Sequence, residues 1–387
     1  MMRFIVILFL ALLPARACLW DRDTLAEEAK GKLDTVKAIT GWFDRYPPKY
    51  YEMRLERVTK ELAAGPEDLD LYDDAGVACS RLGRHDEAIA WMVKKKAILD
   101  RMPEAETAEA RYRYLSNIGT FHLIRWIVKP QAERNADLSD LKASEDFIAR
   151  ALEINPNAHF GREKFQLMLI RWLLGPGLGP DDFYDANFLN LQTNVRMHLG
   201  AIQQPQGFTL EEARLGLTGL VQLGAAWQSA DLFQTLQACL NAEQNGTLAR
   251  LARLRMQELL AEGATSLHPS GDVDEQYREP YNFKDTVKDE KRIDRFYQRA
   301  RTAAKQREAA WITYQEARFA KGQHPDTHPD FWKDWREPEF PQLPDGHWDL
   351  RDSPAPQILT AIAVAILLSW LVKRISRSLA KRSRAAA

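Results

Sequence analysis

The chain has 387 residues, with 53 Lys and Arg against 54 Asp and Glu and a formal charge of −1. Three cysteines are too few for a disulfide framework, and no CxxC or CxxCH motif is present for metal, redox or haem chemistry. Setting aside eight positive charges at the two ends leaves residues 18–357 at about −9, which argues against nucleic acid as a partner.

The first 17 residues, MMRFIVILFLALLPARA, combine an early Arg3, a ten-residue apolar run and a small-x-small ending at Ala17. This pattern predicts a secretory signal peptide over 1–17, because the apolar run is too short to span a bilayer of roughly 30 Å. A first membrane anchor is the alternative. Cys18 follows the cleavage site, but the residues before it depart from the usual lipobox, so its acylation is left open.

Fifteen uncharged residues, 358–372, precede a tail that carries six Lys and Arg and no acid. As a helix the run covers roughly 22 Å, and Trp370 with a snorkelling Lys373 supplies the rest of a span. We predict a single transmembrane helix over 357–373, with a buried core helix as the alternative. The basic tail, 374–387, is then cytoplasmic near anionic lipid, and the preceding domain is exported, into the periplasm if the protein is bacterial.

Between residues 22 and 320 apolar residues recur at intervals of three and four, Gly or Pro separates the runs, and convincing strands are absent. The sequence therefore predicts an all-α protein. One stretch, 71–99, places Tyr72 and Gly76 on a first helix, a stop at Gly83, and Ala88 on a second helix. Small residues let two helix backbones approach, and a glycine ends a helix without strain.

These residues resemble the tetratricopeptide repeat (TPR), a 34-residue unit of two antiparallel helices. A looser copy follows, with Gly119 on its first helix and Pro156 after its second, and residues 126–138 form an insertion between them. Two weaker copies come later in the chain. Because repeats bury their faces only against neighbours, the resemblance implies a right-handed superhelical array of degenerate hairpins over residues 18–284.

In this family the inner face of the first helices holds an extended peptide or a partner helix, and some members bind a C-terminal carboxylate with Lys and Asn. The resemblance implies inner-face positions at Asp70, Asp73, Asp74, Val77, Ser80, Arg81, Arg113, Ser116, Asn117 and Thr120. The first helix lacks the family's basic clamp. Its three aspartates favour a basic or neutral protein or peptide partner.

Residues 285–321 form a predicted long charged helix with an interrupted apolar stripe, which we expect to cap the array. A coiled-coil dimer is the alternative, and the oligomeric state is left open. Residues 322–356 hold seven prolines together with several aromatic residues, among them Trp332 and Trp335. We predict a stalk whose aromatic residues pack back on the domain, rest at the headgroup level or bind a ligand.

Recognisable catalytic motifs such as HExxH, GxSxG, a Walker loop or GxGxxG do not occur. His324 and His328 have a metal-like spacing, but the prolines beside them forbid the helix that would put both on one face. Paired carboxylates such as Asp181 and Asp182 are typical of solvated surfaces. We therefore expect no metal site and no cofactor.

The sequence favours a membrane-anchored scaffold that exposes a helical repeat domain for protein–protein interaction on the exported side. Two alternatives remain: an all-helical enzyme whose pocket lies within residues 159–268, and a binder of envelope glycan that uses the stalk tryptophans. A cavity that gathers His, Asp and Glu would favour an enzyme, whereas a smooth groove would favour the scaffold.

Overall fold

The computed structural model describes residues 19–29, 33–156, 161–175, 187–191, 207–224, 226–269 and 290–343. All secondary structure in these ranges is helical, which confirms the all-α prediction. The predicted signal peptide, transmembrane helix and basic tail lie outside them, as do Cys18, Asp181 and Asp182. Among the helices that are described, none is both long and apolar enough to cross a membrane.

The described helices all belong to the first of two compact units, which ends at Gln342. The first eight helices are α1 (Arg22–Ala29), α2 (Thr35–Thr40), α3 (Pro48–Ala64), α4 (Leu69–Arg81), α5 (His85–Leu99), α6 (Glu104–Ile127), α7 (Gln131–Ala136) and α8 (Ser139–Ile154). The later helices are α9 (Arg162–Leu174), α11 (Leu210–Gly219), α12 (Ala230–Ala242), α13 (Gly246–Ala261) and α15 (Glu290–Phe319). A π-helical turn (Leu220–Gly224) and a 3₁₀ turn (Ala226–Gln228) connect α11 to α12.

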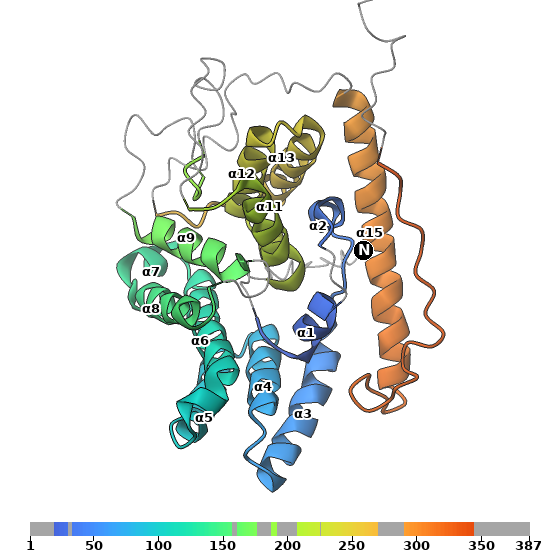
Figure 1. The fold of residues 1–387 in the computed structure, drawn as a ribbon. Coiled ribbons are helices and arrows are strands. Elements are labelled where there is room, and N and C mark those ends of the chain that lie inside the picture. The colour runs from blue at the N-terminus through green and yellow to red at the C-terminus, as the bar shows by residue number, and fades with distance from the viewer. Residues whose placement is uncertain are drawn as a thin grey trace, which may run out of the picture. The chain divides into compact units, whose positions relative to one another are not determined.

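From α3 to α13, each of the longer helices packs against the next one along the chain (Figure 1). Stacked helical hairpins produce this order of neighbours, because each unit buries its apolar face on the following unit. The superhelical hand of a TPR array stays a prediction. The predicted insertion at 126–138 contains the short helix α7, whose Arg134 carbonyl accepts a hydrogen bond from the Trp126 indole at 3.1 Å.

The hairpin of α4 and α5 depends on two glycines. Gly83 adopts φ +75° after the end of α4, and the next amide, of Arg84, donates to the Cys79 carbonyl at 2.9 Å, which closes the helix end. A Cβ atom on Gly76 would lie 3.0 Å from the side chains of Met92 on α5 and Phe121 on α6. The absence of a side chain at Gly76 therefore lets three helices meet closely.

Helix α15 packs against α13, against the short helix α2 and against α3, so it contacts helices from both the late and the early parts of the chain. Figure 1 shows α15 along one side of the helices, with the short helix α2 next to its upper half. The predicted capping helix thus packs on α13, the last described helix before it, and also contacts α2 and α3 near the start of the chain. Its buried stripe includes Ile293, Phe296, Ala300 and Trp311.

The described part of the predicted stalk, residues 322–343, packs back on the helices. His324 is buried and its Nε2 lies 3.1 Å from the carbonyl oxygen of Tyr50 on α3. Trp332 stacks on Trp311 of α15 with ring centroids 4.1 Å apart. These residues are thus part of the helical unit rather than an extended spacer, because their aromatic rings find apolar partners on α3 and α15.

Candidate functional site

The residues just before α1 lie against α4, α6 and α9, at positions that the resemblance to the repeat family implied for binding and at Glu163. Leu19 and Trp20 are both 0% exposed. The side-chain amide of Asn117 on α6 binds the backbone of Trp20 twice: Oδ1 accepts from the Trp20 N–H at 2.7 Å, and Nδ2 donates to the Trp20 carbonyl at 2.9 Å. The indole N–H of Trp20 donates to Ser116 Oγ at 2.9 Å and to Glu163 Oε1 at 3.1 Å.

Two buried aspartates of α4 complete this arrangement. Asp74 accepts from the backbone N–H of Arg22 at 3.2 Å and from its guanidinium Nε at 2.6 Å. Asp73 accepts from Lys95 Nζ at 2.6 Å and from Asn117 Nδ2 at 3.1 Å, so the lysine fixes the carboxylate that orients the asparagine. Burial raises the pKa of both carboxyl groups, while Lys95 lowers that of Asp73 and the neighbouring arginines lower that of Asp74.

We call the residues that hold this N-terminal segment the inner-face groove: Asp73, Asp74, Ser116, Asn117 and Glu163. Four of the five are positions that the resemblance to the repeat family implies. Their occupant is the chain's own backbone at Trp20 and Arg22.

The other predicted positions are spread more widely. Asp70 is exposed and its carboxylate lies 3.3 Å from Arg113, whereas Ser80 and Thr120 are fully buried. Arg81 donates to the carbonyl of Gly224 at 3.1 Å.

The three aspartates of α4 that the sequence predicted for a basic or neutral partner do not form an exposed acidic surface. Asp73 and Asp74 are only 2% and 1% exposed. The N-terminal segment covers one of them and Lys95 neutralises the other, so only Asp70 faces solvent.

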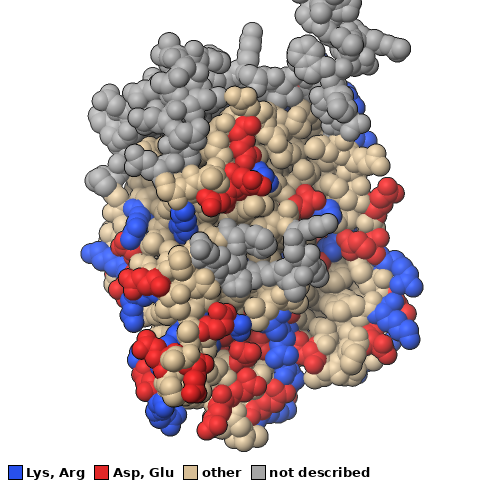
Figure 2. All heavy atoms as spheres, in the orientation of Figure 1, with Lys and Arg blue, Asp and Glu red and all other residues tan. Residues whose placement is uncertain are grey.

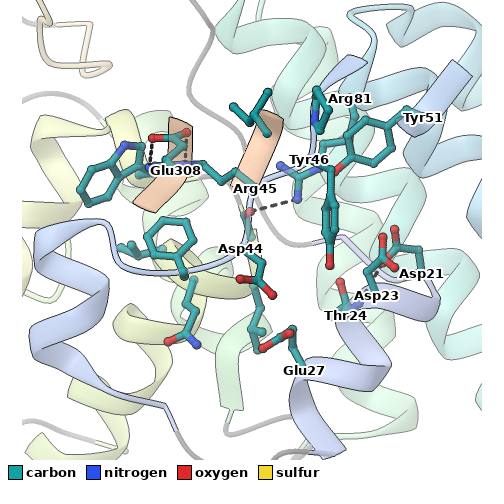
Figure 3. Close-up of a pocket in the computed structure, with 18 of the residues that line it drawn as sticks. Asp21, Asp23, Thr24, Glu27, Asp44, Arg45, Tyr46, Tyr51, Arg81 and Glu308 are labelled. Atoms are coloured by element: carbon teal, nitrogen blue, oxygen red, sulfur yellow. Dashed lines mark hydrogen bonds and ion pairs between the residues drawn. The ribbon is translucent and has the colours of Figure 1, made fainter. Parts of the chain in front are cut away.

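A pocket of about 460 Å³ lies beside the N-terminal segment (Figure 3). Its charged and aromatic lining residues are Asp21, Asp23, Glu27, Phe43, Asp44, Arg45, Tyr46, Tyr51, Arg81, Trp227, Glu308 and Glu316. They come from α1 and the residues before it, from the connection between α2 and α3, from the ends of α3 and α4, from the 3₁₀ turn, and from α15. Among the residues predicted for binding, only Arg81 lines this pocket.

Three carboxyl groups of the lining, which we call the acidic wall, come from one stretch of the chain: Asp21, Asp23 and Glu27. The buried guanidinium of Arg54 donates to Asp23 Oδ2 at 2.7 Å and to Asp21 Oδ2 at 3.4 Å. Burial raises the pKa of Asp21 to about 7, and the neighbouring Asp23 carboxylate raises it too, against the lowering effect of Arg54. Asp21 therefore exchanges a proton near neutral pH.

Another part of the lining holds an arginine beside two aromatic rings. The Arg45 guanidinium lies 4.8 Å from the Phe43 ring centroid and 5.1 Å from that of Trp227. Its Nε and Nη2 donate to the two carboxylate oxygens of Glu308 at 2.7 and 2.6 Å. This part of the lining already accommodates one guanidinium by aromatic contact and bidentate carboxylate pairing.

Two tyrosines, Tyr46 and Tyr51, also line the pocket. In Figure 3 the Tyr46 ring lies between the carboxylates of Asp21 and Asp23 on one side and those of Asp44 and Glu27 on the other. Burial raises the pKa of Tyr51 to about 12, so its hydroxyl stays neutral under physiological conditions.

The two histidines with metal-like spacing have other partners. Burial lowers the pKa of His324 to about 4, so its ring is neutral and accepts from the Asp326 amide at 3.1 Å. Within the described ranges, no three His, Cys, Asp or Glu side chains gather closely enough to hold a metal ion.

The sequence placed the alternative enzyme pocket within residues 159–268, but that region contributes only residues 221–224, 227 and 228 to the observed one. The remaining wall was missed because its residues are far apart in the sequence. The one local signal was the density of acids in WDRDTLAEE, Trp20–Glu28, directly after the predicted cleavage site.

Neither a protein-family model, nor a curated protein, nor a solved structure matches this chain.

Proposed function

We propose that the chain is an exported, membrane-anchored recognition protein that captures a protein or peptide partner by a basic side chain held in the acidic pocket. The predicted signal peptide and transmembrane helix support the membrane topology, and the resemblance to a repeat family supports protein recognition. The observation that carries the proposal is the charge of the pocket, which six carboxylates and only two arginines line.

Charge favours a cationic guest. Arg45 is paired with Glu308, and Asp44 is paired with Arg307 at 2.6 Å. The acidic wall contributes three carboxyl groups, of which Asp21 and Asp23 share the guanidinium of Arg54 with Asp326. Because a charge in a partly desolvated pocket interacts more strongly than in water, an added cation is favoured and an added anion is opposed.

The aromatic residues favour a cation that carries an apolar stem. Phe43, Tyr46, Tyr51 and Trp227 supply apolar lining between the charged groups. Lys and Arg side chains combine a hydrocarbon stem with a charged end, and such ends also bind the faces of aromatic rings. A basic side chain of a partner therefore fits the pocket better than an inorganic cation does.

The proposal keeps the basic partner that the sequence favoured, but it moves the binding site from the aspartates of α4 to the pocket. The carboxylates that attract it are in the pocket, whereas Asp73 and Asp74 are used inside the chain. Figure 2 shows acidic and basic side chains interleaved over the visible face rather than a single basic patch, which accords with a protein partner rather than nucleic acid.

The test is a calorimetric titration of the full chain in detergent micelles with Nα-acetyl-arginine amide. Nα-acetyl-citrulline amide is the matched neutral probe, because it has nearly the same shape without the charge. We expect the arginine probe to bind and the citrulline probe to bind at least tenfold more weakly. Equal affinity for the two probes, or no heat from either, would contradict the proposal.

A pair of variants locates the binding. Glu27 and Glu316 line the pocket, and a partly exposed ion pair contributes up to about 1 kcal/mol. Replacing both by Gln should therefore weaken the arginine probe roughly fivefold or more. The matched control replaces the exposed Glu133 and Glu153, on α7 and α8 outside the pocket, by Gln and should leave the affinity unchanged.

A further inference from the structure

We infer that the inner-face groove is a peptide-binding site whose ligand is the chain's own segment Leu19–Arg22, and that this docked segment positions the acidic wall of the pocket. The first half of the inference stands on the contacts of the groove alone. The second half rests on the proposed function.

The contacts have the form of peptide recognition rather than of ordinary core packing. The side-chain amide of Asn117 forms hydrogen bonds with both the N–H and the carbonyl of Trp20. It therefore recognises main-chain groups, and it requires an extended backbone at Trp20. A second backbone N–H, that of Arg22, is bound by Asp74. Three hydrogen bonds from two side chains therefore bind the main chain, as a groove does when it accepts an extended peptide.

Side-chain contacts add selectivity for this particular segment. The Trp20 indole donates to Ser116 and Glu163, its ring meets Tyr112 edge-on with centroids 5.8 Å apart, and the Arg162 guanidinium lies 4.6 Å from its ring centroid. The groove thus requires an aromatic donor followed, two residues later, by a basic side chain.

Two further buried side chains hold the Asn117 amide in place. Lys95, which is 0% exposed, holds Asp73, and Asp73 accepts from the Asn117 amide that clasps Trp20. This relay fixes which way the Asn117 amide faces, because the amide nitrogen must point at Asp73 and at the Trp20 carbonyl. The orientation of the Asn117 amide is therefore supported by side chains of α4 and α5 as well as by the segment itself.

Docking of the segment determines the pocket. Asp21 lies between Trp20 and Arg22, the two residues that the groove binds, and Asp23 and Glu27 follow within α1. These three residues are the acidic wall. If the segment leaves the groove, the pocket loses the carboxyl group of Asp21, and Asp23 and Glu27 lose the anchor at Arg22 that precedes them in α1. Asn117 is thus a positioning residue for ligand binding, although it does not line the pocket.

The test is hydrogen exchange of the full chain in detergent micelles, read on fragments that cover residues 19–27. Asn117→Ala removes both bonds to Trp20, so these amides should exchange roughly tenfold faster, while amides in the middle of α4 and α6 keep their protection. The matched control, Asn241→Ala at the end of α12, should change neither. Unchanged protection of residues 19–27 in Asn117→Ala would overturn the groove.

A milder variant keeps the test decisive where Asn117→Ala disturbs the whole fold. Trp20→Phe keeps an aromatic ring but removes the indole donor to Ser116 and Glu163. We expect severalfold faster exchange confined to residues 19–27. An effect spread evenly over all helices would show that Trp20 serves the general core and would overturn the groove.

The coupling to the pocket is tested by reciprocity. A ligand that binds only the docked state must also stabilise docking, so saturating Nα-acetyl-arginine amide should slow exchange of residues 19–27 in the unmodified chain. Probe binding without this slowing would overturn the coupling. Failure of the proposed function is distinguishable, because then calorimetry shows no probe binding while the Asn117→Ala result still tests the groove.

Discussion

The proton on Asp21 links the stability of the fold to pH in a way that Asp21→Asn should remove. Its side chain is 5% exposed, and its pKa is raised from 3.8 to about 7. Between these two values the folded chain holds a proton that the unfolded chain has lost. Stability therefore falls as pH rises from about 4 to 7, and the effect is complete above 7.

The magnitude follows from the size of the shift. One pKa unit corresponds to about 1.4 kcal/mol, so the shift of about three units from 3.8 costs at most about 4 kcal/mol above pH 7. Between pH 5 and pH 8 the cost grows by roughly 2 to 3 kcal/mol. An Asn side chain at this position has no charge to desolvate. The free energy of unfolding of Asp21→Asn should therefore rise, relative to that of the unmodified chain, by roughly 2 to 3 kcal/mol between pH 5 and pH 8.

The assay is urea unfolding of the full chain in detergent micelles at pH 5 and pH 8, followed by helical circular dichroism. The control is Asp146→Asn on α8, whose carboxylate is 64% exposed and which should show no such gain. If the difference between Asp21→Asn and the unmodified chain is the same at both pH values, Asp21 does not hold the proton and the description of the acidic wall is wrong.

Three further results are expected. Replacing Lys95, whose ammonium pairs with the buried Asp73, by Met should cost about 3 to 5 kcal/mol in urea unfolding, and adding Asp73→Leu should recover most of it; a loss below about 1 kcal/mol would refute the pairing. Gly76→Val should cost about 1 to 3 kcal/mol because its side chain meets Met92 and Phe121, whereas Gly65→Ala, with open space around it, should cost nothing measurable. The arginine probe should bind up to about tenfold more tightly at pH 8 than at pH 6, because below pH 7 it must displace the proton of Asp21; an affinity independent of pH in calorimetry would contradict this.

The local features of the fold could be predicted from the sequence. Apolar spacing predicted helices, and the Leu-Gly break predicted the turn after α4, where Gly83 has a positive φ. The resemblance to the repeat family implied Asn117 and Asp74 as binding positions, and both contact the N-terminal segment. The segment that contacts these residues could not be predicted, because Trp20 and Asn117 are 97 residues apart and no local periodicity relates them.

The pocket was harder to predict for the same reason. Its lining comes from five separate stretches of the chain, and an acid such as Glu316 on the surface of a long charged helix looks like any other solvated carboxylate in the sequence. For the described part of the predicted stalk, the sequence left three alternatives for the aromatic residues, and the structure shows the first, packing on the domain. Proline excluded a regular helix over 322–343 correctly, but aromatic burial such as that of Phe331 decided that the segment packs on the domain.

The proposal that a basic side chain of a partner enters the pocket is tested most directly by photocrosslinking in native membranes. A photoreactive phenylalanine analogue at Ile312, which lines the pocket on α15, should yield a protein adduct whose crosslinked fragment contains Lys or Arg. The adduct should be lost when Glu27 and Glu316 are replaced by Gln and retained when Glu133 and Glu153 are replaced. An adduct of undiminished yield after the pocket carboxylates are neutralised would contradict the proposal.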